Sequence, residues 1–242
     1  MKFTLLTVSD DINDDARADE SLIAYAAQGI PAASIWRTSQ GLVVPRSYLR
    51  ASQFESTCQK FAQAGWPISV RQSGGGVVPQ GPGIINLSLA YAVHGKPLDH
   101  SDAGYQQICD VIGQALQGLG IDTRAQAVEG SFCDGRYNLA TGSQDQARKV
   151  VGTAQVWRRQ PGVNNNEAFQ VALVHAMILA HADINAITDQ ANQLELALGH
   201  DRRYLNHSAV SLHLCGDHGL DGPSFTKHLM ARLADRLDSF PA

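Results

Sequence analysis

The order of strand-like and helix-like segments along this 242-residue chain limits its possible folds more than any other feature. Apolar residues recur at helical spacing, and helix ends are marked, over residues 16–29, 52–65, 101–120, 183–198 and 224–238. Short β-type runs lie between or beside them, at 34–37, 41–44, 68–70, 84–89, 125–129, 137–141, 149–157, 169–180 and 208–214. No regular strand–helix–strand repeat connects these segments. The sequence therefore predicts an α+β fold rather than a doubly wound α/β fold.

Composition is consistent with one large folded domain or with a large domain that carries a small appendage. Hydrophobic residues make up 44% of the chain and charged residues 17%, which supplies a core and argues against disorder. The chain becomes more polar at 183–205. We therefore expect a main domain over 1–182 and a small C-terminal helical region over 183–242.

Charge and cysteine spacing exclude several classes of function. The net charge of −4 gives no reason to expect a nucleic-acid partner. The four cysteines, Cys58, Cys109, Cys133 and Cys215, contain no C-x-x-C pair, so we expect no metal site and free thiols. No apolar run approaches the roughly 20 residues that span a bilayer, and the N-terminus does not resemble a signal peptide. A cytoplasmic protein without a membrane partner is the expected result.

A glycine-rich segment from Arg71 to Gly83, with the sequence RQSGGGVVPQGPG, connects two predicted strands. Five of the ten residues from Gly74 to Gly83 are glycine, which costs more backbone entropy than an ordinary hairpin requires. Close approach of amide N–H groups to a carboxylate or phosphate would explain this cost, and a flexible hairpin loop is the alternative. The spacing matches neither a P-loop nor a dinucleotide fingerprint.

Lys149 opens a β-type run with the sequence KVVGTAQ, whose members are mostly apolar or small. In that setting an ammonium group can stabilise a phosphate or a developing oxyanion. For a lysine considered alone, a solvent-facing position at a strand edge is the more common explanation.

Cys133 and His175 are two further candidates. Cys133 lies in the loop sequence GSFCDGR near Arg136, where a cysteine can act as a nucleophile, although no general base is adjacent in sequence. His175 is a polar residue inside an apolar strand. A histidine buried in the core with its hydrogen bonds satisfied is the usual explanation for such a position.

The two motifs, taken in order, resemble the lipoate-protein ligase A, octanoyltransferase and biotin-ligase superfamily. That family has an arginine followed by a Gly-Gly-Gly loop and, roughly 75 residues later, a Lys-x-x-Gly-x-Ala-Gln strand. Here they correspond to Arg71 with its glycine loop and to the strand that begins at Lys149. Asp19-Glu20 and Trp36 resemble the opening of the family's domain.

The resemblance implies a central mixed β-sheet flanked by helices, with 1–182 as a catalytic acyl-transfer domain. It implies that Lys149 contacts the activated carboxyl group and that the glycine loop holds the acyl chain. The residues that it assigns to substrate binding are Arg71, Ser73, Gly74, Gly75, Gly76, Val77, Gly152, Thr153, Ala154 and His175. The product would be an amide on a lysine of a lipoyl domain or of a glycine-cleavage H protein.

Two branches of the family differ in their acyl donor. Ligases use free lipoate with ATP and Mg²⁺, whereas transferases take octanoate from acyl carrier protein without a cofactor, some of them through a cysteine thioester. This chain has Gln80-Gly81 where ligases have His-Asp, and Asn138 where ligases have a carboxylate near adenylate and metal. Cys133 lies 16 residues before Lys149, close to the position of the nucleophile in cysteine-dependent transferases.

The leading hypothesis is therefore a lipoate-protein-ligase-like enzyme, with octanoyl transfer through Cys133 as the first alternative. A non-catalytic protein that binds lipoate or another acyl compound is a second alternative, because the carboxylate and the His-Asp pair are replaced. A nucleotide-binding enzyme of another fold is a third, which lacks a standard phosphate-binding motif.

Overall fold

The computed structural model describes residues 2–13, 17–132, 134–162 and 167–239, and their strands form two sheets. The large sheet has the strand order β1 (Thr4–Asn13), β2 (Ala32–Thr38), β6 (Ile84–Val93), β10 (Phe169–Leu179), β9 (Arg148–Gln160), β8 (Leu139–Thr141) and β7 (Arg124–Ala125). The small sheet has the order β4 (Ile68–Arg71), β3 (Gly41–Pro45) and β5 (Val78–Gln80). Each sheet contains one parallel pair, β1 with β2 and β3 with β4, and its other pairs are antiparallel. The predicted α+β class with a mixed sheet is confirmed.

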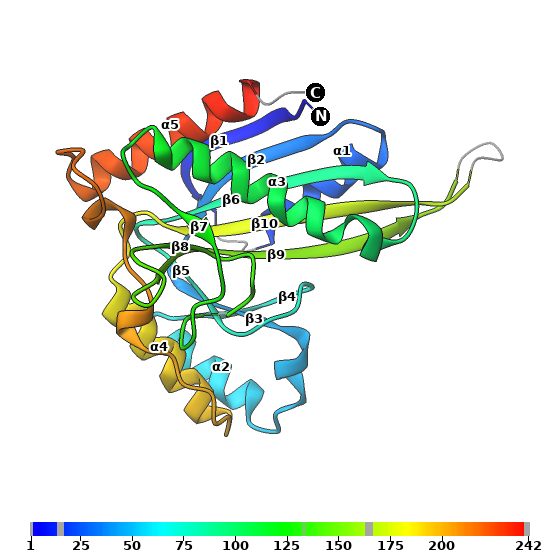
Figure 1. The fold of residues 1–242 in the computed structure, drawn as a ribbon. Helices are drawn as coiled ribbons and strands as arrows, with labels where there is room; N and C mark the ends of the chain where they lie inside the picture. Colours follow the sequence, from blue (N-terminus) through cyan, green and yellow to red (C-terminus); the bar gives the residue numbers. More distant parts are fainter. Residues whose placement is uncertain (1, 14–16, 133, 163–166, 240–242) are drawn as a thin grey trace.

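Helices cover both faces of the large sheet. Helices α3 (Pro97–Gln117) and α5 (Gly222–Ser239) lie side by side across one face, where their apolar stripes form the main core with the strands (Figure 1). The short helix α1 (Leu22–Ala27) packs on the opposite face against β2, β6 and β10. The sheet is therefore shielded from water on both sides over its central strands.

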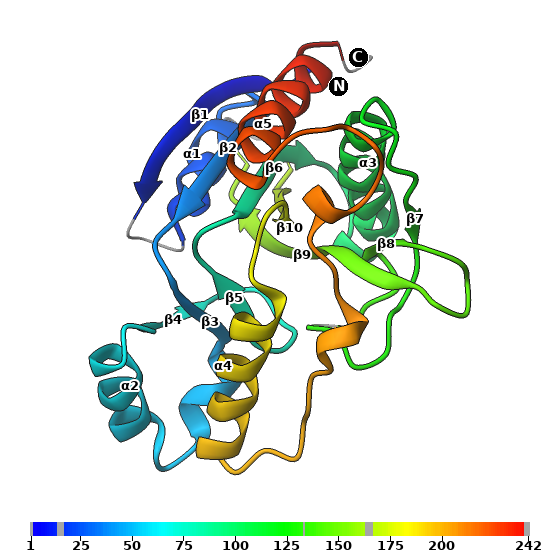
Figure 2. The same ribbon diagram turned by 90° about the vertical axis from the view of Figure 1, so that its left-hand side faces the viewer.

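The small sheet is packed by two other helices, α2 (Phe54–Gln63) and α4 (Ile184–Ala197). Figure 2 shows both helices beside β3, β4 and β5, away from α3 and α5. Helix α4 begins where predicted, and its N-cap Asp183 accepts a hydrogen bond from the Ala186 N–H at 3.0 Å. This second core holds the small sheet, and with it the glycine-rich loop, in a fixed position.

Strand β10 confirms the prediction that the apolar run at 169–180 is a buried strand. It is hydrogen-bonded on both sides, to β6 and to β9, in the middle of the large sheet. Val174 and Ala176 join the core with α3 and α5, whereas Leu173 joins the core with α1. Because side chains alternate along a strand, His175 lies on the same face as Leu173 and not in the main core.

Some expected boundaries are wrong. The long helix begins at Pro97, not near Ser101, because proline is well suited to the first helical turn. The segment at 208–214 is not a strand but contains two short 3-10 turns, at Asn206–Ser208 and Leu212–Leu214. The N-terminal strand β1 was not predicted, and the expected strand at 125–129 is reduced to Arg124–Ala125.

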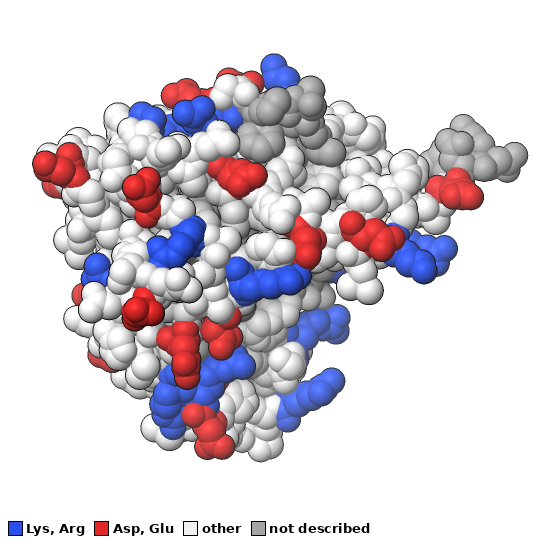
Figure 3. Space-filling view, viewed as in Figure 1, with Lys and Arg blue, Asp and Glu red and all other residues white. Residues whose placement is uncertain are grey.

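The residues after 182 contribute to both cores. Helix α4 packs on the small sheet, and α5 contributes Phe225, Leu229 and Leu233 to the main core. The predicted boundary between 1–182 and 183–242 stays a prediction. On the face drawn in Figure 3, Lys and Arg side chains are intermingled with Asp and Glu side chains. Within the described ranges, no helix is long and apolar enough to cross a membrane.

Candidate active site

A cavity lies between the two sheets, and most of its lining is apolar or small. Its walls come from β2, β6, β9 and β10 of the large sheet, from the small sheet and glycine loop, and from the segment before α1. The lining residues are Arg17, Asp19, Glu20, Trp36, Val43, Arg71, Gln72, Ser73, Val78, Gln80, Asn86, Lys149, Gly152, Thr153, Ala154, Val156, Leu173, His175, Ala176 and Met177. Such a pocket suits a largely apolar ligand that carries one polar end.

Strand register places residues from the cavity side of the large sheet together in two rows. In one row Ser88 of β6 lies opposite His175 of β10, which in turn lies opposite Ala154 of β9. In the next row Trp36, Asn86, Met177 and Gly152 lie opposite one another across β2, β6, β10 and β9, in that order. Because side chains two positions apart share a face, both rows point to the cavity side of the sheet.

Lys149 is fully buried and lines the cavity. Its Nζ atom donates a hydrogen bond to the backbone carbonyl of Phe132. The backbone of Lys149 is held by Val210, whose N–H donates to the Lys149 carbonyl at 3.0 Å. Lys149 is therefore not a solvent-facing lysine at a strand edge, which is the more common position for a lone lysine. A buried ammonium at a cavity wall is suited to stabilise negative charge on a ligand.

Arg71 organises the glycine-rich loop. Its Nη2 atom donates to the carbonyls of Gly74 and Gly76, both at 2.8 Å, and its Nη1 atom donates to the carbonyl of Val43 at 2.9 Å. One planar guanidinium group thus ties the loop to the small sheet, which a lysine could not do with the same geometry. A Cβ atom at Gly76 would lie 2.5 Å from Nη1 of Arg202 and 2.8 Å from the Tyr204 hydroxyl, so a side chain there would displace the groups beside the loop.

A second network holds the far side of the loop. The Tyr204 hydroxyl accepts a hydrogen bond from the Val77 N–H at 3.3 Å and donates to Oε1 of the fully buried Glu195 at 2.7 Å. Tyr48 donates to the same carboxylate oxygen at 2.7 Å, and His200 bonds to Oε2 at 2.7 Å. Burial, followed by the bond to Glu195, raises the pKa of both tyrosines well above the ordinary value. Both hydroxyls therefore stay protonated donors.

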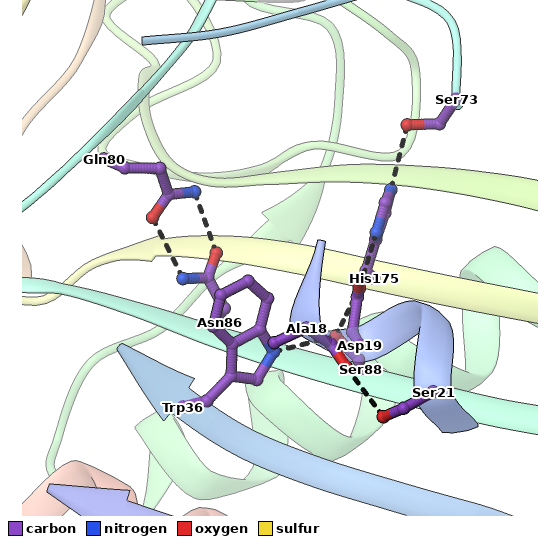
Figure 4. A network of polar contacts seen from close by, with 9 residues as sticks. All are labelled: Ala18, Asp19, Ser21, Trp36, Ser73, Gln80, Asn86, Ser88 and His175. Carbon is purple, nitrogen blue, oxygen red and sulfur yellow. Dashed lines mark hydrogen bonds and ion pairs between the residues drawn. The ribbon is translucent and has the colours of Figure 1, made fainter. Parts of the chain in front are cut away.

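A chain of polar contacts reaches the cavity from the segment before α1 (Figure 4). Asp19 Oδ2 lies 2.9 Å from His175 Nδ1, and His175 Nε2 lies 3.2 Å from Ser73 Oγ. Ser88 Oγ donates to the same Asp19 oxygen at 2.9 Å and accepts from Trp36 Nε1 at 3.1 Å. His175 is therefore not an isolated histidine of the core but the middle member of a network at the cavity wall.

Gln80 and Asn86 form a reciprocal amide pair beside this network. Gln80 Nε2 donates to Asn86 Oδ1 at 3.0 Å, and Asn86 Nδ2 donates to Gln80 Oε1 at 2.9 Å. Figure 4 shows the pair next to the Trp36 indole. Since both side chains are buried, this pairing satisfies two amides that would otherwise be costly in the cavity wall.

The structure brings together most, but not all, of the residues selected from the sequence. Arg71, Ser73, Lys149, Gly152, Thr153, Ala154 and His175 line the one cavity. Gly74, Gly75, Gly76 and Val77 belong to the loop but not to the lining, and Gly76 and Val77 contact Arg71 and Tyr204 instead. Asn138 is buried outside the lining. Cys133 lies outside the described residues, and it follows Phe132 in the sequence.

The three described cysteines are ordinary buried or half-buried thiols. Burial, with a smaller contribution from Asp110, raises the pKa of Cys109 to about 12. Burial also raises the pKa values of Cys58 and Cys215. A raised thiol pKa lowers the thiolate fraction near neutral pH, so none of these three is suited to be a nucleophile.

Several cavity residues were not selected from the sequence as site residues. Asp19 and Trp36 were noted only as part of the family resemblance, and Asn86 and Met177 were not considered. Ser88, which contacts Asp19 from outside the lining, was not considered either. A polar residue at an inward position of an otherwise apolar strand, as at Ser88 and Asn86, was the available signal. Whether such a polar residue belongs to a site depends on which strands lie next to its own strand in the sheet.

This geometry agrees with a comparison to protein families. Residues 19–212 match the family model described as the lipoyl protein ligase A/B catalytic domain, so the chain belongs to this family. The family recognised from the glycine loop and the Lys149 strand is confirmed, and with it the class of acyl-transferring enzyme.

Two individual relatives are similar over most of this chain. A protein of Cupriavidus necator named as uncharacterised is 46% identical over 230 residues, covering 93% of this chain and 90% of its own length. An octanoyl-[GcvH]:protein N-octanoyltransferase of Kyrpidia tusciae is 30% identical over 216 residues, covering 88% of this chain and 71% of its own length.

Among solved structures, a lipoate-protein ligase A bound with ATP superimposes with a TM-score of 0.66 at 14% identity, covering 98% of this chain and 86% of that chain. A putative lipoate protein ligase from T. acidophilum with bound lipoic acid has a TM-score of 0.61 at 16% identity, with the same coverage. At these identities the similarity concerns the fold.

Proposed function

We propose that this enzyme transfers an octanoyl or lipoyl group to the ε-amine of a specific lysine in a lipoyl domain or a glycine-cleavage H protein. The observation that carries the proposal is the fully buried Lys149 in the wall of a largely apolar cavity. An acyl chain needs apolar walls, and its reacting carbonyl needs a cation where negative charge develops. The cavity provides both the apolar walls and the cation.

The acyl chain would lie along the apolar wall formed by Val156, Leu173 and Met177, with its carbonyl carbon toward Lys149. When the acceptor amine attacks this carbon, the carbonyl oxygen becomes negative, and the Lys149 ammonium stabilises it. The Phe132 carbonyl orients this ammonium. Arg71 holds the glycine loop in one conformation beside the cavity.

We further propose that the donor is an acyl group carried on a protein, not free lipoate with ATP. The Kyrpidia tusciae relative, named for transfer from octanoyl-[GcvH], supports this choice. The buried Asn138 offers an amide where a Mg²⁺ site needs carboxylates, and it does not line the cavity. The residues present at this position therefore do not fit a nucleotide-bound Mg²⁺.

The test compares donors on one acceptor. The protein is incubated with an apo lipoyl domain and octanoyl-acyl carrier protein, octanoyl-H protein, or lipoate with ATP and Mg²⁺, and the acceptor mass is measured. We expect octanoylation of the acceptor lysine from a carrier-bound donor. Acylation only with lipoate and ATP would overturn the donor assignment. Calorimetric binding of octanoate without any transfer would indicate a binding protein and overturn the enzymatic proposal.

Cys133→Ser determines whether the route passes through the cysteine predicted as a nucleophile. A thioester at Cys133 predicts that this variant loses transfer from the carrier, whereas Cys58→Ser, at a thiol outside the cavity lining, serves as the matched control. Retained transfer by Cys133→Ser would exclude that cysteine as an essential intermediate.

A further inference from the structure

The segment that connects β7 to β8 is bonded to β9 through two of its backbone carbonyls. The Phe132 carbonyl accepts a hydrogen bond from Lys149 Nζ, and the Tyr137 carbonyl accepts one from Thr153 Oγ1 at 2.8 Å. Lys149 and Thr153 both line the cavity. The segment is therefore attached at two points to side chains that face the proposed acyl group.

Helix α3 holds the same segment at Tyr137. The rings of Tyr105 and Tyr137 are stacked, with their centroids 4.8 Å apart and an angle of 10° between their planes. Cys109 Sγ donates to the Tyr137 carbonyl at 3.4 Å, so this oxygen receives a donor from α3 as well as the one from Thr153. Figure 2 shows α3 beside β7 and β8, the two strands that the segment connects.

Arg136 adds a second contact between the segment and α3. Its guanidinium carbon lies 4.9 Å from the centroid of the Tyr137 ring, and its Nη2 atom lies 2.6 Å from Asp102 Oδ1. Asp102, Tyr105 and Cys109 are spaced three and four residues apart, so they share one face of α3. That face of the helix is thus occupied by Arg136 and Tyr137.

A purely structural role for these contacts is the alternative. The side chains of Arg136 and Asp102 are 72% and 57% exposed, and an ion pair in such a position adds little to stability. Residues 134–136 are exposed and belong to none of the cores that the described residues form. Contacts that add little to the folded state, yet lead to two cavity-lining side chains, are better explained by their effect on the cavity.

We propose that Tyr137 is a positioning residue for acyl transfer, held by Tyr105 and acting through Thr153 and Lys149. Tyr137 itself does not line the cavity. Its carbonyl fixes the direction of the Thr153 hydroxyl, and its ring keeps the segment where the Phe132 carbonyl orients the Lys149 ammonium. A displacement of about 1 Å in a positioned group can lower a reaction rate by about a hundredfold. The inference rests on the proposed acyl transfer and applies to any donor.

The test measures kcat and KM with an apo lipoyl domain and the donor that the unmodified chain uses. Tyr137→Ala removes the ring, so we expect kcat to fall by about a hundredfold while KM for the donor changes little. Tyr105→Ala removes the other ring of the stack and should have the same effect. Tyr137→Phe keeps the ring and should restore kcat. Tyr25→Ala, at a ring that is 43% exposed on α1, is the matched control and should change neither constant.

Thr153→Val tests whether Tyr137 acts through the threonine hydroxyl. Valine has nearly the shape of threonine but cannot donate a hydrogen bond to the Tyr137 carbonyl. Two residues that act through one contact have non-additive effects. The double variant of Tyr137→Ala and Thr153→Val should therefore be no slower than the slower of the two single variants. Effects that multiply in the double variant would contradict the inference.

An unchanged kcat in Tyr137→Ala would overturn the inference, and so would an equal loss of kcat in Tyr137→Phe. If Tyr137→Ala does not fold, Tyr105→Ala decides in its place, because alanine is favourable in a helix. Failure of the inference is distinguishable from failure of the proposed function. If only the inference is wrong, the unmodified chain and Tyr137→Ala transfer the acyl group equally well. If the proposed function is wrong, the unmodified chain transfers nothing from any donor.

Discussion

At the scale of single residues, Lys149 shows how a tertiary environment changes the meaning of a side chain. On its own in the sequence it resembles a solvent-facing lysine at a strand edge. In the structure it is fully buried, with its ammonium bonded to the Phe132 carbonyl at the cavity wall. Burying an ammonium group is unfavourable, so its retention here is consistent with a catalytic use of the charge.

Lys149→Met tests this use directly. Methionine keeps an unbranched apolar chain but removes the charge, so we expect acyl transfer to fall by about 10²–10³-fold. Stability should stay the same or increase, because an apolar isostere replaces a buried charged group. Transfer rates and thermal unfolding measure the two effects. The exposed Lys227→Met is the control, and equal activity in both variants would contradict the role of Lys149.

Gly152 controls the position of the same ammonium group. A Cβ atom at this position would lie 2.8 Å from Lys149 Nζ and 3.0 Å from its Cε. Gly152→Ala should therefore displace the flexible end of Lys149 and lower the transfer rate by about a hundredfold. The free energy of unfolding should change by no more than about 1 kcal/mol.

The matched control for Gly152→Ala is Gly113→Ala on α3, where the nearest atom to a new Cβ is Thr123 Oγ1 at 3.7 Å. Alanine is the better helix former, so this variant should be slightly more stable and fully active. A Gly152→Ala protein with an unchanged rate would show that the position of the ammonium is not critical.

At the scale of elements, the glycine loop owes its conformation to one side chain at its own start and to another from a distant segment. Arg71 holds its carbonyls from one side, and Tyr204 holds Val77 from the other, with Glu195 of α4 behind it. Glycines permit the close approach, but these two side chains select one conformation. The loop therefore has one defined conformation and is not a flexible hairpin.

Tyr204→Phe removes one of these supports. It leaves the Val77 N–H without its hydroxyl acceptor and leaves Glu195 Oε1 with one tyrosine donor fewer. We expect a loss of about 1–3 kcal/mol in the free energy of unfolding, measured in urea, because buried polar groups become unsatisfied. Acyl transfer should also slow. Tyr25→Phe, at a side chain that is 43% exposed, should change neither quantity.

At the scale of the whole molecule, two cores meet at the cavity. The large sheet with α3 and α5 provides one wall, and the small sheet with α2 and α4 provides the other (Figures 1 and 2). The chain crosses between these cores several times, and its last helix returns to the first core. The cavity therefore depends on both cores being folded.

Leu233→Ala tests whether the C-terminal region is separable, as the predicted boundary at 182 and 183 implies. Leu233 is fully buried among residues of α3 and the large sheet. We expect a loss of about 2–5 kcal/mol in a single unfolding transition, seen equally by circular dichroism and tryptophan fluorescence. Two separate transitions would show instead that residues 183–242 unfold as an independent appendage.

The sequence alone determined the fold class, the central strand at 169–180, most of the helices and the two motifs that identify the family. These features are local, because side-chain periodicity and glycine content are set within a few residues. Asn138 shows the limit of this reasoning, because it was selected by its position in a motif and lies outside the cavity lining. The role of Cys133 stays a prediction, since that residue lies outside the described residues.

Only the tertiary structure determined which polar residues meet. Asp19 and His175 are 156 positions apart, and Ser73 and His175 are 102 positions apart, so no local pattern connects them. The strand order β2, β6, β10, β9 and its register place Ser88, His175 and Ala154 in one row. A shift of one residue in that register would turn His175 into the main core. The partners of Lys149 and His175 were thus decided by strand pairing, a non-local property that local residue patterns do not specify.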